Sequence, residues 1–277
     1  MEYINISTFN CWGFNNLIIQ QTINEYLEKS RILCLQETWK YNINEFANLN
    51  KTFQIVHSCS MDENLKLVGR PFGGLAIMLT KDISLKLVAQ QKHFIAIEAL
   101  INGRTIVICN TYLPPKNPMK TENENFQFIS EILGNATSCL ECYTEIILLG
   151  DLNYHKETRC RRSLQIREFL SALSFEENTD LKFYPKDEYS YESFINGSRG
   201  QPDRILATKT VEKFVRNCLV DHTYRDSDHF ICTAIIDHYN NFNQQKGSKS
   251  IASKPSLDWT SFDDDMIAAT FLHNKTL

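Results

Sequence analysis

Short apolar segments of strand length recur through the first 237 residues and alternate with stretches of helical periodicity. Residues 126–133 and 166–173 repeat apolar side chains at intervals of three and four, as one face of a helix does, and 15–29 has similar spacing. Strands that alternate with helices build layered α/β domains. The sequence therefore predicts an α/β fold. The predicted strands are 4–9, 31–35, 53–57, 75–79, 95–100, 105–110, 145–149, 189–194, 204–207 and 230–236.

The composition is that of a globular chain. The 277 residues are 43% hydrophobic and 22% charged, and a chain of this length buries about 70–75% of its unfolded surface. No segment approaches the roughly 20 apolar residues of a membrane span, and the first residues do not form a signal peptide. We therefore expect an intracellular protein, nuclear or cytoplasmic rather than secreted, that does not contact membranes.

The cysteines agree with this compartment. Nine are scattered along the chain, an odd number that does not form a disulfide framework. Cys139 and Cys142 have the spacing of half a zinc site, but no second pair stands at a matching distance. We expect free thiols.

The composition changes near Asp237. Residues 238–256 are rich in Asn, Gln, Ser and Lys, which is typical of a flexible linker. The remaining residues are too few for a second core. We expect one domain over 1–237 and a linker or tail over 238–277.

Polar residues with useful chemistry stand where the predicted strands begin or end. Acids at strand ends converge when the strands lie side by side. Carboxylates joined by an Asn amide form a hard oxygen site that suits Mg²⁺, or Mn²⁺, rather than zinc. A nearby His whose other ring nitrogen is held by a carboxylate can bind or protonate a phosphoryl oxygen. The residues are Asn10, Glu37, Asn110, Tyr112, Asp151, Asn153, Asp203, Asp228 and His229.

Each of these residues has an ordinary structural explanation when taken alone. Glu37 can complement a helix dipole, and Asp151 with Asn153 can build an Asx turn. Asp228 and His229 can belong to a solvated loop. Their combination, in this order and at these strand ends, favours a metal-assisted phosphoester hydrolase.

The ordered motifs resemble those of the endonuclease/exonuclease/phosphatase superfamily of metal-dependent phosphoesterases. The resemblance extends from Met1 to about Ile236, and it implies a DNase I-like fold: a four-layer sandwich of two packed mixed β-sheets flanked by helices, with the active site at one rim. The matching stretches are 8–13, Leu35-Gln-Glu-Thr38, Gly73-Gly-Leu-Ala76, 110–115, Gly150-Asp-Leu-Asn153, 202–206 and Ser227-Asp-His229.

The resemblance also implies roles. Glu37 is expected to be the main Mg²⁺ ligand, with Asn10 and Asp228 nearby. Asp151 is expected to orient or deprotonate the attacking water, with help from Asn153. His229 is expected to contact the scissile phosphate, with Asp203 as its partner. Tyr112 is expected to reach a phosphate oxygen.

Some stretches are most similar to the endonuclease domain of non-LTR retrotransposons, namely 10–14, 32–39 and 69–76. The tail segment 254–262 resembles the link from such a nuclease to a reverse transcriptase. The chain departs from the family pattern at Pro202, which restricts the backbone before Asp203 and bears on the position of the His229 partner.

The substrate class follows less directly. The net charge of −4 argues mildly against bulk electrostatic binding of nucleic acid. Arg159, Arg161 and Arg162 follow the Asp151 motif and are candidates to hold phosphates, although a solvated helix face explains them equally well. We expect a monomeric, apurinic-endonuclease-like enzyme that uses Mg²⁺ and nicks one strand of double-stranded DNA. The alternatives are an inositol-phosphate or lipid phosphatase of the same fold, and a catalytically dead interaction module.

Overall fold

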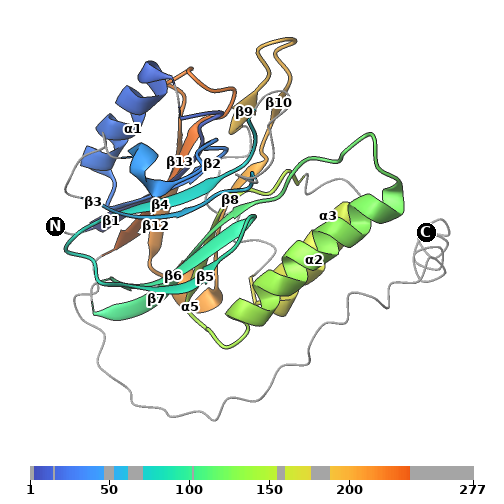
Figure 1. The fold of residues 1–277 in the computed structure, drawn as a ribbon. Helices are drawn as coiled ribbons and strands as arrows, with labels where there is room; N and C mark the ends of the chain where they lie inside the picture. The colour runs from blue at the N-terminus through green and yellow to red at the C-terminus, as the bar shows by residue number, and fades with distance from the viewer. Residues whose placement is uncertain are drawn as a thin grey trace.

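Two β-sheets pack face to face, and helices cover their outer sides (Figure 1). The computed structural model describes residues 3–14, 16–46, 53–61, 71–101, 103–154, 160–175 and 188–237. The predicted linker and tail, 238–277, lie outside the described residues, so the domain boundary stays a prediction. Within the described ranges, no helix is long and apolar enough to cross a membrane.

The first sheet has six strands in the order β12-β13-β1-β2-β4-β3. β1 and β2 are parallel and are joined by α1 (Leu17–Lys29), which begins where Asn16 accepts the main-chain N–H of Ile18 at 2.9 Å. All other neighbours in this sheet are antiparallel. The strands are β1 (Tyr3–Asn10), β2 (Ile32–Gln36), β3 (Phe53–Ser58), β4 (Leu75–Thr80), β12 (Val215–Asp221) and β13 (Ile231–Asp237).

The second sheet has five strands in the order β11-β8-β7-β6-β5. β7 and β8 are parallel and are joined by α2 (Glu122–Leu140), which Thr121 and Glu124 start with a capping box. α3 (Arg161–Ala172) packs beside α2 on the same face. The strands are β5 (Leu85–Gln90), β6 (Phe94–Ile101), β7 (Arg104–Tyr112), β8 (Ile146–Asp151) and β11 (Asp203–Ala207).

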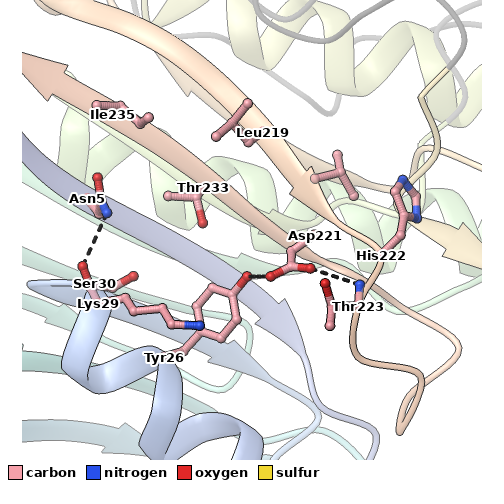
Figure 2. Close-up of a pocket in the computed structure, with 11 residues that line it drawn as sticks. Asn5, Tyr26, Lys29, Ser30, Leu219, Asp221, His222, Thr223, Thr233 and Ile235 are labelled. Atoms are coloured by element: carbon pink, nitrogen blue, oxygen red, sulfur yellow. Dashed lines mark hydrogen bonds between the residues drawn. The ribbon is translucent and has the colours of Figure 1, made fainter.

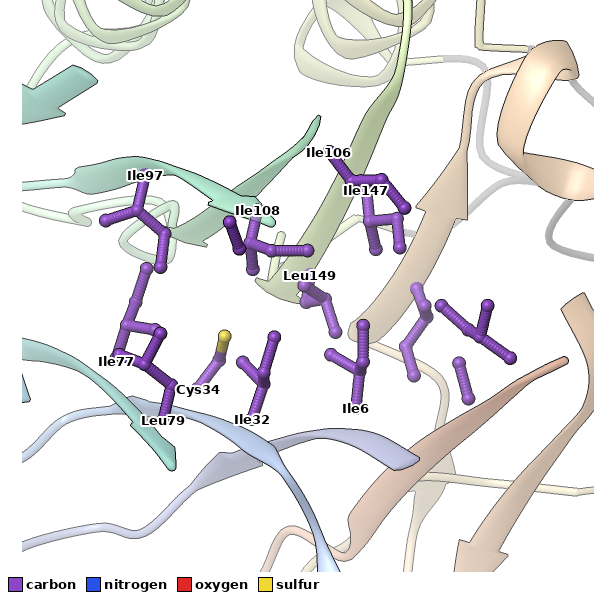
Figure 3. Packing of buried hydrophobic residues seen from close by; sticks show 14 of the residues in the cluster. Ile6, Ile32, Cys34, Ile77, Leu79, Ile97, Ile106, Ile108, Ile147 and Leu149 are labelled. Atoms are coloured by element: carbon purple, nitrogen blue, oxygen red, sulfur yellow. The ribbon is translucent and has the colours of Figure 1, made fainter. Parts of the chain in front are cut away.

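Branched aliphatic side chains fill the space between the sheets (Figure 3). Ile6 and Ile32 of the first sheet face Ile108 and Leu149 of the second, and none of these four side chains is solvent-accessible. Separate apolar clusters lie under α1 and under α2 and α3. Truncation of one such isoleucine to alanine costs about 2–5 kcal/mol of stability. The predicted four-layer sandwich is confirmed.

The structure differs from the predicted strands at 189–194, and it has further elements that were not predicted. The segment 189–194 is extended only at β9 (Tyr191–Glu192), which pairs with β10 (Arg199–Gly200), because a tight turn follows. In that turn Gly197 has φ +67° and donates its main-chain N–H to Ser193 O at 2.9 Å. The edge strands β5 and β12 were not predicted, nor were the short elements η1 (Ile43–Phe46) and α5 (Lys209–Glu212).

Candidate functional site

The register of the strands brings the predicted site residues to one rim between the two sheets. β1 and β2 run parallel with Asn10 beside Gln36, so Glu37 follows at the same edge. In the second sheet Asp151 of β8 is paired with both Tyr112 of β7 and Asp203 of β11. Parallel strands that end together therefore place Glu37 and Asp151 at this rim. Asp203 joins them as the first residue of the antiparallel strand β11.

Side-chain hydrogen bonds cross from one sheet to the other at this rim, and three of them join two predicted site residues. Asn10 Nδ2 donates to Asp151 Oδ2 at 3.0 Å. The Tyr112 hydroxyl donates to Glu37 Oε1. His229, just before β13, lies with Nδ1 2.8 Å from Asp203 Oδ2. Each pair joins a group of the first sheet to a group of the second, so the site belongs to neither sheet alone.

Asp151 is a buried carboxylate held by amide donors. Its Oδ1 accepts the main-chain N–H of Asn153 at 2.8 Å, and its Oδ2 accepts Asn153 Nδ2 at 3.2 Å. Burial raises the pKa of Asp151 to about 6; the charge of His229 opposes this rise, and the charge of Asp203 adds to it. The carboxylate is therefore ionised at neutral pH but is far more basic than an ordinary aspartate.

Asp203 and His229 form a buried acid–imidazole pair. Ser190 Oγ accepts the main-chain N–H of Asp203 at 3.2 Å, and Ser227 Oγ accepts that of His229 at 3.1 Å. Pro202 does not displace Asp203, which pairs in register with Asp151 and reaches the imidazole. This removes the sequence-based concern about that proline.

The Asp203 pair orients the imidazole and makes it basic. With Nδ1 bonded to Asp203, Nε2 points to the rim and lies 4.0 Å from both Asp151 Oδ2 and Asp228 Oδ1. Burial alone lowers the pKa of His229, but the charge and hydrogen bond of Asp203, with the charges of Asp151 and Asp228, raise it to about 9. At neutral pH His229 is a cation beside carboxylates.

The Glu37 carboxylate has donors on both oxygens. Beside the Tyr112 bond to Oε1, Trp39 Nε1 donates to Oε2 at 2.6 Å and the main-chain N–H of Gly73 donates to the same oxygen at 2.9 Å. Glu37 is 7% exposed. The side chain is thus fixed by groups from three separate segments.

Backbone strain is concentrated at these strand ends. Four of the five described non-glycine residues with positive φ are Trp12, Glu37, Trp39 and Asn153, with φ between 45° and 56°. Such conformations cost of order 1–3 kcal/mol each and persist where the surrounding structure imposes them. Strain of this kind is typical of functional sites.

The donor set fits a hard divalent cation. Asp228 Oδ1 is buried and has no hydrogen-bond partner among the described residues, so a carboxylate oxygen is left over for a ligand. Glu37 and Asn10 supply further oxygens, which Mg²⁺ prefers. Asp151, Asp203 and His229 also bring one possible ligand atom each within 4.8 Å of one another. In that group, Asp203 Oδ2 and His229 Nδ1 are already hydrogen-bonded to each other.

The predicted substrate arginines do not act alike. Arg159 lies outside the described residues. Arg161 donates to Asn123 Oδ1 at 2.7 Å and covers the Phe126 ring at 3.9 Å, so its guanidinium is held against α2. Arg162 lies behind Asp151, where its Nη2 donates to Leu113 O at 3.3 Å, and burial lowers its pKa. Arg162 is the better placed of the two to influence the site.

A groove of about 580 Å³ on the outer side of the first sheet lies between α1 and the strands β12 and β13 (Figure 2). Its acid, Asp221, accepts the Tyr26 hydroxyl and the main-chain N–H of Thr223 at 2.8 Å. The predicted site residues do not line it.

Sequence reasoning missed several residues that hold the site. The Ser227-Asp-His229 motif was recognised, but no role was assigned to Ser227, whose hydroxyl donates to Asn10 O at 2.8 Å. Trp39 and the Gly73 main chain were not predicted as Glu37 donors. Tyr191 was placed in a strand only, yet its ring lies 5.1 Å from that of His229. The Gln-Glu-Thr-Trp39 string was the one available signal for Trp39.

A profile of the endonuclease/exonuclease/phosphatase family matches residues 7–229. This range contains every predicted site residue from Asn10 to His229. The chain belongs to this family. The family predicted from the sequence motifs is therefore confirmed, and no curated protein sequence matches the chain.

Solved structures share the fold of this family member. The AP endonuclease LMAP from Leishmania major superposes with a TM-score of 0.70 at 16% identity, over 86% of this chain and 88% of that one. An AP endonuclease from Archaeoglobus fulgidus gives 0.63 at 21% identity, over 84% and 99%. The endonuclease domain of TRAS1, a telomere-specific non-LTR retrotransposon, gives 0.56 at 15% identity, over 88% and 100%. At these identities the likeness concerns the fold.

Proposed function

We propose that the chain is a Mg²⁺-dependent phosphodiesterase that nicks one strand of double-stranded DNA. The observation that carries the proposal is the buried trio of Asp151, Asp203 and His229. Its imidazole is 2.8 Å from one carboxylate and 4.0 Å from the other. A basic carboxylate can activate water, and an oriented imidazolium can bind a phosphoryl oxygen, so the two groups at one rim suit hydrolysis of a phosphodiester.

Asp151 is the group that activates water. With a pKa near 6 it is ionised at neutral pH and still basic enough to accept a proton. Asn10 and Asn153 donate to its oxygens and hold the carboxylate in one orientation. The attacking water is thus presented to the phosphorus from the second sheet.

His229 binds the scissile phosphate. Its Nε2–H points to the rim and donates to a non-bridging phosphate oxygen, while Asp203 holds Nδ1 and stabilises the charge. Glu37, Asn10 and Asp228 would hold the cation, which when bound neutralises phosphate charge and polarises the phosphoryl oxygen. The Tyr112 hydroxyl donates to Glu37 Oε1. When substrate is bound, the same hydroxyl can donate to a phosphate oxygen instead.

An exposed aromatic rim favours nucleic acid over a small polyanion. Trp12 is 40% and Phe194 is 60% exposed, with ring centroids 6.3 Å apart. Phe194 belongs to the same hairpin as Tyr191, which contacts His229. Open ring faces beside a phosphate site suit bases, each of which stacks for about 1–3 kcal/mol. An inositol phosphate offers no such surface.

The fold shared with the TRAS1 endonuclease domain and the AP endonucleases supports a DNA substrate. With the motifs at 10–14, 32–39 and 69–76, it also supports descent from a non-LTR retrotransposon endonuclease.

Nicking of supercoiled plasmid by the full chain with Mg²⁺ tests the proposal. Open-circle product is expected from the native protein and is lost in His229→Ala and Glu37→Gln. Lys86→Ala is the matched control and should nick like the native protein. Lys86 lies on the edge strand β5, is exposed, and forms an ion pair with Glu98. Phosphate release from inositol phosphates without nicking would favour the phosphatase instead, and neither activity in a folded, Mg²⁺-binding protein would favour an interaction module.

A further inference from the structure

The hydrogen bonds of Glu37 leave one lone-pair position of its carboxylate unoccupied. A carboxylate presents about four lone-pair positions, two on each oxygen. Trp39 Nε1 and the Gly73 main-chain N–H fill both positions of Oε2. Within the described ranges, Oε1 accepts from Tyr112 alone. The remaining position is therefore on Oε1.

The Trp39 donor is fixed in place. A Cβ atom at Gly13 would lie 2.3 Å from Trp39 Cε3, so the indole is seated directly on the glycine backbone. The main-chain N–H of Trp39 donates to Gly73 O at 3.0 Å, which ties the two Oε2 donors together. The backbone segments that carry the two donors are therefore held to each other.

We propose that the indole N–H of Trp39 is a positioning group that limits Glu37 to one metal bond, through Oε1, and thereby favours Mg²⁺ over Ca²⁺. This inference rests on the Mg²⁺ site of the proposed function. Mg²⁺ is small and strict in geometry, whereas Ca²⁺ takes 6–8 oxygens and accepts both oxygens of one carboxylate. An Oε2 that is already occupied opposes the second mode.

Metal affinity of the full chain without DNA tests the inference. Isothermal titration with MgCl₂ and, separately, with CaCl₂ gives a Kd for each ion. Partners that orient a metal ligand typically change affinity about 10–100-fold. In Trp39→Phe we expect Mg²⁺ to bind about 10-fold more weakly while Ca²⁺ binds as well or better. The ratio of the two Kd values is the readout, and a merely structural role would move both ions together.

A second variant guards against loss of packing in Trp39→Phe. Benzothienylalanine at position 39 keeps the bicyclic shape and seats on Gly13, but replaces the N–H with sulfur. The same change in the Kd ratio is expected. Tyr143→Phe is the matched control, because it removes another aromatic donor to a glutamate, the 2.8 Å bond from the Tyr143 hydroxyl to Glu98 Oε1, outside the proposed metal site. Its Kd ratio should match that of the native chain.

The outcomes separate the two proposals. Equal changes for both ions, or none, in both position-39 variants would overturn the role of Trp39 while leaving nicking untouched. Mg²⁺ binding with the expected ratio change but without nicking would overturn the endonuclease and support the role of Trp39. A native chain that binds neither ion would overturn both.

Discussion

Asn10 and Asp151 stand 141 positions apart in the chain and are joined by a buried 3.0 Å hydrogen bond from Nδ2 to Oδ2. Asn10 ends β1 in the first sheet, and Asp151 ends β8 in the second. Oδ1 of the same Asn10 amide accepts the main-chain N–H of Trp12 at 3.2 Å. One side chain thereby orients the acid that we propose activates water, and it also anchors a rim loop.

Asn10→Ala should lose about 10²-fold in kcat, because a positioned general base contributes about 10²–10⁴-fold and Asp151 would lose one of its donors. Steady-state nicking with Mg²⁺ measures the loss. Asn5→Ala is the control on the same strand, since among the described residues its Nδ2 donates to Lys29 O alone, on the outer side of the sheet. Equal losses in the two variants would contradict a specific role for Asn10.

The pH profile of kcat/KM should be bell-shaped. The acidic limb reports the pKa of Asp151, about 6, below which the carboxylate is protonated and cannot activate water. The basic limb reports the pKa of His229, about 9, above which the imidazolium loses its proton. Asp203→Asn should move the basic limb to lower pH, because the Asp203 charge is the largest contribution that raises this pKa. A basic limb that stays in place would exclude His229 as its origin.

Acid should destabilise the fold partly through His57. Burial lowers the pKa of His57 below 6.5, although the main-chain bond to Lys40 and the charge of Glu45 oppose the shift. As pH falls below 6.5 the unfolded chain binds a proton that the folded chain does not, so stability falls by at most about 1.4 kcal/mol per pH unit. This contribution vanishes above pH 6.5.

Urea unfolding at pH 5 and 7.5 measures the effect. His57→Phe removes the titrating group beside Phe46, whose ring centroid is 5.2 Å away. The variant should lose less stability than the native chain between the two pH values. An identical loss in both proteins would assign the acid sensitivity to other groups.

Gly150→Ala should separate β7 from β8. Gly150 has φ +131°, and an added Cβ would lie 1.9 Å from the Thr111 carbonyl oxygen. Overpacking and backbone strain together should cost about 3 kcal/mol or more. The control is Gly103→Ala, where φ is +79° but nothing lies within 4 Å of the added Cβ, so strain acts alone. Thermal unfolding of both variants checks the difference.

The strands that sequence patterns predicted are mostly those buried on both faces. β2 and β8 are buried at every position, and their continuous apolar runs are unmistakable. The edge strands β5 and β12 carry exposed side chains such as Lys86 and Asn217, so their periodicity is weak. Their strand identity comes from pairing with a neighbour.

The site was predictable as far as its chemistry lies in side-chain type. Carboxylates and an imidazole at the ends of predicted strands can be recognised from the sequence, as at Asp151, Asp203 and His229. The Gly73 donor to Glu37 is a main-chain N–H, 36 residues away in the chain, and has no side-chain signature. The exposed tip at Phe194 depends on a turn that interrupts a strand-like pattern.

The distribution of the site over both sheets ties hydrolysis to completion of folding. Asn10 ends a strand of the first sheet, with Glu37 just after β2 and His229 just before β13, while Asp151 and Asp203 belong to the second sheet. A nascent chain that has not yet emerged beyond His229 lacks the cross-sheet partner of Asp203. A shift of one sheet over the other by one residue, about 3.3 Å along a strand, would separate the hydrogen-bonded partners of the site. Immature or misassembled copies should therefore lack the proposed hydrolytic activity.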